Sequence, residues 1–477
     1  MRGTRGVLQN LSILTAGQVA SQLLNVWALV FLAERLGAHW FGVVQIGVTF
    51  MSYALITAEW GMAQLGIREV ARLEDLPTVR RYVREHIGLM AAQAAVVVLV
   101  GLLVLPRLPF YAADPVVFVL YLLAVVPQIY LLAWVAIGLE RMTVVGAAKS
   151  GQSLLYAVLV LTLLLPLHAW TGAPAHQLVP VLFLAAMIGG DLIVTIPVSR
   201  WFGAFPWPGW PSLAEARRRW RETAPVGGSV IVLRILLNVD IIMLGLLATA
   251  EAAGKYAAAS RVIFMLVVAI EVLWNALLPR FSRLARFDRA GHVRAFNLYL
   301  GCVLGGLLPV AVGGVLLGPE LMDTLYGGEF PEAGPVFQLL AVSYTLLATG
   351  KFLGNTLISE DRQARYLPAV IAGAVVAVVG TATLIPHLGG FGAAVGMAAS
   401  HVLLAAWLTV VLRRAFRRVL LETLLLLVPA LVFMGVVVQA AEGWHVVPRV
   451  LVGGAAYLAL AAWPLWRLVR RSRVSRG

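Results

Sequence analysis

The chain has 477 residues, of which 61% are hydrophobic and only 13% are charged, and its net charge is +14. A soluble protein of ordinary composition is about 25% charged, so this composition excludes a typical soluble globular domain. The basic residues lie beside long apolar runs, which is typical of membrane topology signals and contacts with anionic lipid headgroups rather than of nucleic-acid binding.

Apolar runs long enough to cross a bilayer, roughly 20 residues each, recur along the whole chain. They predict an all-α polytopic membrane protein with fourteen transmembrane helices. The expected ranges are 11–33, 39–59, 87–105, 115–138, 148–166, 178–199, 224–246, 257–279, 298–318, 335–357, 368–385, 390–412, 419–440 and 446–466. The two longest connections, near 60–86 and 200–223, are expected to hold short amphipathic or cytoplasmic helices.

The distribution of basic residues supports this count of spans. With the N-terminus inside, 30 of the 37 Lys and Arg residues fall on the inner side and three lie within spans. The outer side carries only Arg35, Arg107, Lys255 and Arg449. A missed span would disturb this alternation, so the positive-inside rule predicts that both termini are cytoplasmic. The first span is long and contains Gln18, Gln22 and Asn25, which argues against a cleaved signal peptide.

A shift of 212 residues superimposes the first half of the chain on the second. Gly42 then falls on Gly254, and Glu59 falls on Glu271. This parallel repeat predicts two six-helix lobes with a cavity between them. The expected parts are an N-terminal lobe at 1–212, a C-terminal lobe at 213–413, and a segment at 414–477 with the last two helices and a basic cytoplasmic tail.

Several segments resemble the polysaccharide flippases. LAERLGAHWFGVVQ at 32–45 is similar to the junction between their first two helices, and EWGMAQLGIREVAR at 59–72 to the segment that follows. LYGGEFPEAGPVFQLLA at 325–341 resembles their ninth-to-tenth connection, and GGFGAAVGMAAS at 389–400 the start of their twelfth helix. The chain is therefore identified with the oligosaccharide (O-antigen-type) flippases of the multidrug/oligosaccharidyl-lipid/polysaccharide exporter superfamily.

The resemblance implies a function in polysaccharide biosynthesis for the cell envelope, in a bacterial-type inner membrane. A flippase of this kind moves a polyprenyl-diphosphate-linked oligosaccharide from the inner to the outer leaflet by alternating access. Expected partners are that lipid-linked glycan, anionic membrane lipids, and a glycan polymerase or glycosyltransferases, with no nucleic acid. Three alternatives stay open: an ion-coupled multidrug exporter, a lipid II flippase, and a membrane scaffold without transport activity.

No motif for turnover chemistry stands out in the sequence. VVGAAKS at 144–150 has the Lys and Ser of a P-loop but lacks its pair of glycines and follows no strand. No Cys/His cluster has metal-ligand spacing, and the one cysteine, Cys302, indicates a small packed side chain. We therefore expect a protein that is not an enzyme and uses no cofactor.

Charged residues inside spans are candidate functional residues, because each costs at least ~3 kcal/mol unless it is accommodated. Arg234 and Asp240 lie in the apolar run VIVLRILLNVDIIMLG at 230–245. On a regular helix they point about 120° apart, so they should not pair with each other. For Asp240 we expect Arg261 as a structural partner. For Arg234 the alternatives are a buried pair with Glu271 and contact with a diphosphate, whose oxygens match the guanidinium fork.

The remaining candidates form two sets. Substrate binding is assigned to three cations and to amides on the first and seventh spans, where polar side chains suit sugar hydroxyls: Arg234, Lys351, Arg261, Gln22, Asn25, Asn238 and Gln18. Ion coupling is assigned to intramembrane titratable groups: Asp191, Glu271, Glu59 and His401. For His401 the alternative is a core histidine with a satisfied hydrogen bond.

Two arginine clusters lie in the long inner connections, at 68–84 and 217–221. The first contains Arg68, Arg72, Arg80, Arg81 and Arg84, and the second Arg217, Arg218, Arg219 and Arg221. Retention of topology explains them, and capture of anionic headgroups at the inner leaflet is the alternative.

Overall fold

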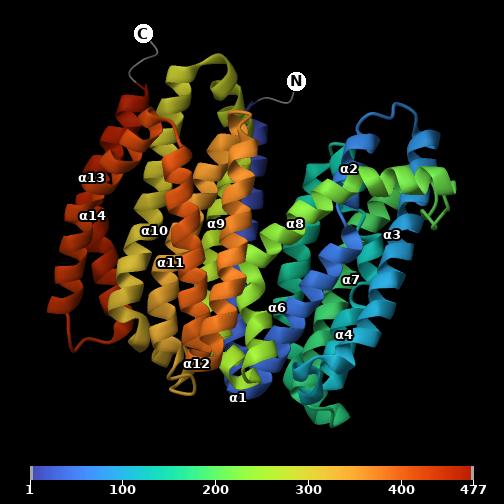
Figure 1. Ribbon diagram of the computed structural model, residues 1–477, viewed down its shortest axis with the longest axis horizontal. Coiled ribbons are helices and arrows are strands. Elements are labelled where there is room, and N and C mark those ends of the chain that lie inside the picture. Colours follow the sequence, from blue (N-terminus) through green and yellow to red (C-terminus); the bar gives the residue numbers. More distant parts are fainter. Residues whose placement is uncertain (1–3, 474–477) are drawn as a thin grey trace. The chain divides into compact units, whose positions relative to one another are not determined.

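The computed structural model describes the backbone of residues 4–473 and the side chains of residues 24–265, 281–414 and 416–462. Within the described backbone there is no β-strand. The helices, coloured along the chain in Figure 1, are α1 (Thr4–Glu59), α2 (Met62–Val70), α3 (Leu76–Val104), α4 (Pro115–Leu123), α5 (Ala133–Gly138), α6 (Met142–Thr171), α7 (Ala175–Phe202), α8 (Leu213–Leu247), α9 (Ala250–Phe287), α10 (Arg289–Tyr326), α11 (Ala333–Ser359), α12 (Gln363–Val411), α13 (Arg414–Ala440) and α14 (Val446–Arg473). Three short 3₁₀ helices lie at Leu105–Arg107, Pro109–Ala113 and Pro127–Tyr130.

The all-α polytopic fold is confirmed. Each of the fourteen expected ranges falls on helical backbone, and the range 115–138 is covered by α4, a 3₁₀ turn and α5. Two helices each contain two of the expected spans, joined at a kink. The kink lies at Gly37 (φ 68°) in α1 and at Gly389 (φ 55°) in α12. Both breaks require positive φ, which glycine adopts without steric cost.

The two halves of α12 fold back on each other. Gly396 lies so close to Gly380 and Thr381 that a Cβ on it would be 2.6 Å from the Thr381 nitrogen. Farther along the same pair, the Ser400 hydroxyl donates to the Gly373 carbonyl at 2.7 Å. Small residues therefore let the two spans approach closely, which is the usual basis of helix packing in lipid.

The first long connection contains an expected short helix, whereas the helical part of the second is the start of the long helix α8. In the first, α2 has one apolar face, which buries Met62, Leu65 and Val70. In the second, the start of α8 precedes its apolar part and is capped by Ser212, whose Oγ accepts a hydrogen bond from the Glu215 N–H at 3.2 Å. Serine at an N-cap followed three residues later by Glu is a strong helix start signal.

The chain separates into two compact units, Met1–Gly254 and Lys255–Gly477. In the first unit, α1 packs against α3, α4, α6, α7 and α8. In the second unit, α10 and α11 pack together, α11 packs on α12, and the pair α13 and α14 (red in Figure 1) lies against α10. Along the chain, the boundary between the two units follows Gly254, in the first turns of α9. The internal repeat instead predicts that the second lobe begins at residue 213. The lobes at 1–212 and 213–413 stay a prediction.

Within the first unit, α1 and the start of α9 cross at two glycines. A Cβ on Gly42 would lie 1.7 Å from the Ala250 carbonyl oxygen, and a Cβ on Gly254 would lie 1.9 Å from the Ala38 carbonyl oxygen. The contact is reciprocal, and the 212-residue shift converts Ala38 into Ala250 and Gly42 into Gly254. Such a crossing is what a two-fold relation between repeats produces, which supports the internal repeat.

This crossing generates a stability prediction. Gly42→Ala should lower the free energy of unfolding of the purified protein by about 1–3 kcal/mol. The new methyl group would clash with backbone atoms, which cannot move aside as a side chain can. Gly228→Ala in α8 is the matched control, since a Cβ there meets nothing within 4 Å. The control should be neutral or stabilising by about 0.5–1 kcal/mol, as expected for alanine replacing glycine in a helix. Equal melting curves for the two variants would refute the close crossing.

Candidate functional site

The polar run of α8 is built around a break in the helix. Asn238 has φ −148° and ψ 17°, and it is buried, with 8% of its surface exposed. In a regular helix its N–H would bond to the carbonyl of Arg234, four residues earlier. That carbonyl accepts a hydrogen bond from the hydroxyl of Tyr53 of α1 across 3.4 Å. A side chain of a neighbouring helix thus compensates part of the break, as the membrane interior demands.

The same break gives Asp240 a local function. It lies two residues after the break, in the first turn of the second half of α8, and it is 2% exposed. Its carboxylate accepts the Ile241 N–H at 2.8 Å. Helix N-termini leave N–H groups without backbone partners and favour negative charge, so Asp240 stabilises the restart of the helix. The expected pair with Arg261 stays a prediction.

Arg234 lies on the half of α8 that precedes the break and is half-buried. Tyr53 and Glu59, both on α1, interact electrostatically with it. The structure therefore brings a carboxylate to Arg234 that the sequence had suggested only for ion coupling. The internal repeat could have predicted this neighbour of Arg234, because it aligns Glu59 with Glu271, the partner expected for Arg234. The side chain of Glu271 lies outside the described residues, as do those of Gln18 and Gln22.

The other candidates are placed separately in the two units. Asn25 of α1 is half-buried. Asp191 of α7 is 5% exposed, and neither carboxylate oxygen has a hydrogen-bond partner within the described part of the chain. In the second unit, Lys351 on α11 and Arg261 on α9 are half-buried. His401 on α12 is fully buried, with its Nδ1 2.7 Å from the Ser343 hydroxyl. This contact supplies the hydrogen bond expected of a core histidine.

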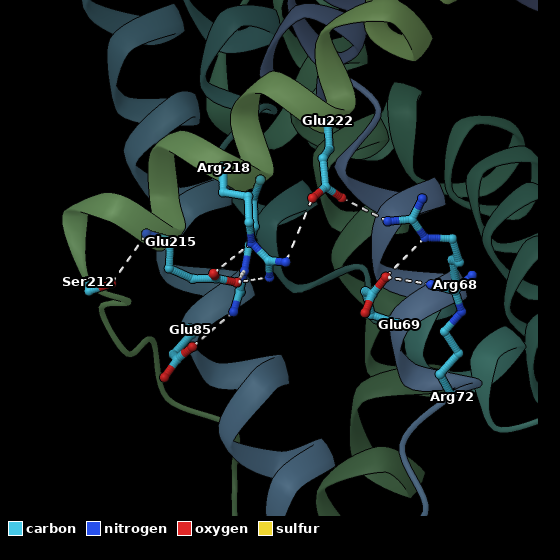
Figure 2. A network of polar contacts seen from close by, with 9 residues as sticks. Arg68, Glu69, Arg72, Glu85, Ser212, Glu215, Arg218 and Glu222 are labelled. Carbon is cyan, nitrogen blue, oxygen red and sulfur yellow. Dashed lines mark hydrogen bonds and ion pairs between the residues drawn. The ribbon is translucent and has the colours of Figure 1, made fainter.

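Five arginines of the clusters at 68–84 and 217–221 belong to an ion-pair network with four glutamates (Figure 2). Arg68 of α2 reaches Glu222 of α8 at 2.8 Å and Glu69 at 3.0 Å. These two hydrogen bonds raise the pKa of Arg68, which keeps it charged. Arg218 pairs with Glu215 and Glu222. The network therefore ties α2 to the start of α8.

Arg219 connects α8 to α3. Its side chain is 5% exposed, contacts Glu85 at 3.0 Å and Glu215 at 2.7 Å, and lies over the ring of Tyr82 at 4.4 Å. Arg84 is engaged as well, since its Nε donates to the Trp207 carbonyl. Two arginines of the clusters, Arg68 and Arg219, thus join different helices through ion pairs. Sequence reasoning missed this function because the acidic partners lie in other elements or one helical turn away.

Comparison with known proteins identifies the family of this chain. Residues 7–285, more than half of the chain, match the family model described as polysaccharide biosynthesis protein. The chain belongs to this family. No curated protein matches the sequence.

Solved structures show the same fold at low identity. The lipid II flippase MurJ in an inward closed conformation is 11% identical with a TM-score of 0.76, covering 96% of this chain and 99% of that one. An inward-facing multidrug resistance MATE family transporter of the MOP superfamily is 12% identical with a TM-score of 0.61, covering 84% and 94%. A MOP superfamily transporter from Pyrococcus furiosus is 15% identical with a TM-score of 0.54, covering 86% and 94%. The family resemblance inferred from the sequence is confirmed by the family model, and these structures confirm the fold.

Arg219 offers a test of the network. Arg219→Ala should destabilise the protein by roughly 1–3 kcal/mol, because it removes the ion pairs with Glu85 and Glu215 and leaves Glu85 with only the exposed Arg81 as a partner. Arg221→Ala is the matched control: Arg221 is exposed and makes no ion pair among the described residues, so its loss should change stability by less than about 0.5 kcal/mol.

Thermal unfolding of the purified variants measures both effects. A double-mutant cycle with Glu85→Ala should show that the two losses are not additive, since both remove one interaction. Independent, additive losses would contradict an ion pair between Arg219 and Glu85.

Proposed function

We propose that the protein carries a polyprenyl-diphosphate-linked oligosaccharide from the inner to the outer leaflet of a bacterial-type inner membrane. The two predicted lobes, 1–212 and 213–413, alternate access to a cationic cavity, and both termini are cytoplasmic. Three findings support the proposal. The chain belongs to a polysaccharide biosynthesis family, it has the fold of a lipid II flippase, and it places an arginine at membrane depth.

Arg234 carries the proposal. An intramembrane arginine is expensive, and this one stands next to a helix break instead of within a regular helix. Its guanidinium offers five donors in a plane, which match the oxygens of a diphosphate, and Glu59 on α1 lies within electrostatic reach of it. Displacement of Glu59 by the diphosphate would exchange one anion for another during binding.

The other candidate residues receive roles consistent with their chemistry. Lys351 and Arg261 would complete the cationic surface of the cavity, and Asn25, Asn238, Gln18 and Gln22 would bind sugar hydroxyls. Asp191, Glu271, Glu59 and His401 are the groups available for coupling to an ion. Anionic lipids, a glycan polymerase and glycosyltransferases are the proposed partners in the membrane.

The membrane potential supplies a driving force without any ion coupling. Moving one negative charge out of a negative interior gains ~2.3 kcal/mol per 100 mV, so a doubly charged headgroup gains roughly twice that. The remaining barrier is the transfer of polar sugars through ~30 Å of hydrocarbon, which a polar cavity removes.

The proposal is tested by flipping in proteoliposomes with a fluorescent polyprenyl-diphosphate-linked sugar. Arg234→Ala should slow flipping at least about tenfold, because a charge-assisted hydrogen bond is worth roughly 1.5–3 kcal/mol. Arg234→Lys should retain part of the activity, since it keeps the charge and loses the fork. Tyr53→Phe should have a smaller effect, because it removes only the hydroxyl that contacts the Arg234 carbonyl.

Arg221→Ala serves as the control for the loss of a positive charge and should flip at the wild-type rate. Melting curves of all variants separate folding from transport. Loss of folded protein in Arg234→Ala would instead assign Arg234 a structural role. Wild-type protein that leaves the lipid in one leaflet, beside an active known flippase, would refute the function. Transport of small cationic drugs or of lipid II in the same vesicles would favour the corresponding alternative.

A further inference from the structure

The first unit carries an apolar groove at the level where α8 begins. It has a volume of about 630 Å³ and lies between the end of α1, α3 and the start of α8. Its walls include Leu89, Val96 and Val97 of α3 together with Leu213 and Trp220 of α8. These side chains are partly exposed, with Val96 at 58% and Leu213 at 86%, so the groove is open to the surroundings.

A second hollow continues the groove along the same two helices. It has a volume of about 340 Å³ and is lined by Phe50 and Tyr53 of α1 and by Val100 and Val104 of α3. Thr57, Val96 and Val97 line both hollows, so the two form one continuous track.

The track is longer than one leaflet of a membrane. From Leu89 to Val104, α3 rises ~22 Å at 1.5 Å per residue. The hydrocarbon core of a bilayer is about 30 Å thick, so one leaflet accounts for about 15 Å. An acyl chain confined to one leaflet would leave part of the track empty, whereas a longer hydrocarbon would fill it.

A cation stands at the end of the track where α8 begins. Arg217 lines the groove and is exposed, and it makes no ion pair with any described residue. Its neighbours Arg218 and Arg219 are held by Glu215, Glu222 and Glu85, as Figure 2 shows for the labelled members. The network thus leaves one positive charge available at the mouth of an otherwise apolar groove.

A side-chain hydrogen-bond bridge joins the helices that form the groove. In the orientation that satisfies both of its ends, the Gln93 amide donates to the Ala58 carbonyl at 3.1 Å and accepts from the Trp220 Nε1 at 3.1 Å. This bridge joins α3 to α1 and α8 and uses up the polar groups on that wall. The surface that remains is apolar, as binding of a hydrocarbon requires.

We propose that this groove binds the polyprenyl chain of the lipid-linked substrate, with its diphosphate near Arg217 at the start of the track. The inference rests on the proposed function and adds a site for the tail in the first unit. Length favours a polyprenyl chain over a phospholipid acyl chain, and the charge of Arg217 complements the diphosphate. Tyr53 connects the two sites, because its ring lines the track while its hydroxyl contacts the Arg234 carbonyl.

Binding to the full-length protein in detergent tests the site, with polyprenyl diphosphate as the probe and native mass spectrometry as the measurement. Val96→Trp fills the point that both hollows share and should weaken binding at least about tenfold, equivalent to ~1.4 kcal/mol. Val375→Trp on α12 is the matched control, since Val375 is 55% exposed and lies far along the chain from the groove. It should bind within about twofold of wild type.

The cation is tested separately. Arg217→Gln should weaken binding of polyprenyl diphosphate about tenfold and leave binding of the uncharged polyprenol unchanged, because only the charge-assisted contact is lost. Arg221→Gln, one turn along the same helix, should bind both lipids like wild type.

Three results would overturn the inference. They are wild-type affinity of Val96→Trp for polyprenyl diphosphate, wild-type affinity of Arg217→Gln for the same lipid, and competition by phosphatidylglycerol as strong as that by polyprenyl diphosphate. Flipping measured in parallel separates the two proposals. Wild-type protein that binds the lipid in the groove but does not flip it would refute the function and leave the site. Normal flipping by a Val96→Trp variant that also binds normally would refute the site and leave the function.

Discussion

The hydrocarbon of a membrane offers no hydrogen bonds to the backbone, and the rest of this structure follows from that constraint. Among the described residues the predicted spans fall on helices, and only the range 115–138 is divided, between α4, a 3₁₀ turn and α5. Glycine supplies the positive φ at residues 37 and 389, where two spans join. At Asn238 the break is accommodated by side chains, since Tyr53 donates to the Arg234 carbonyl and Asp240 accepts the Ile241 N–H.

The break in α8 resolves why one apolar run carries two opposite charges. Asp240 is explained locally, by a helix that must start again inside the membrane. Arg234 is not needed for that purpose, and its electrostatic neighbour Glu59 comes from another helix. A cation and an anion on facing helices form an arrangement that an anionic headgroup can enter by exchange. The tail of the same lipid would lie along α1 and α3, where Tyr53 belongs to both surfaces.

Outside the spans, ion pairs decide which positive charges are available to a ligand. The inner arginines look alike in sequence, yet Arg68, Arg218 and Arg219 each contact carboxylates that fasten α2, α3 and α8 together. Arg217 belongs to the same run and borders an apolar groove instead. Net charge therefore says little about the lipid contacts of this protein, because contact depends on which arginines the glutamates already hold.

The sequence by itself determined the class of fold, since hydropathy, the alternation of basic residues and the positions of glycines report a helical membrane chain through local chemistry. It also identified the polar residues of α8 and the family to which the chain belongs. Only the tertiary structure decided which distant residues meet: Glu59 of α1 lies within electrostatic reach of Arg234, and the reciprocal crossing of Gly42 and Gly254 places two distant helices in backbone contact. Regular-helix geometry was wrong at Asn238, where the backbone departs from helical φ and ψ and Tyr53 of another helix donates to the nearby Arg234 carbonyl. Contacts of this kind depend on residues far apart in the chain, which no local pattern encodes.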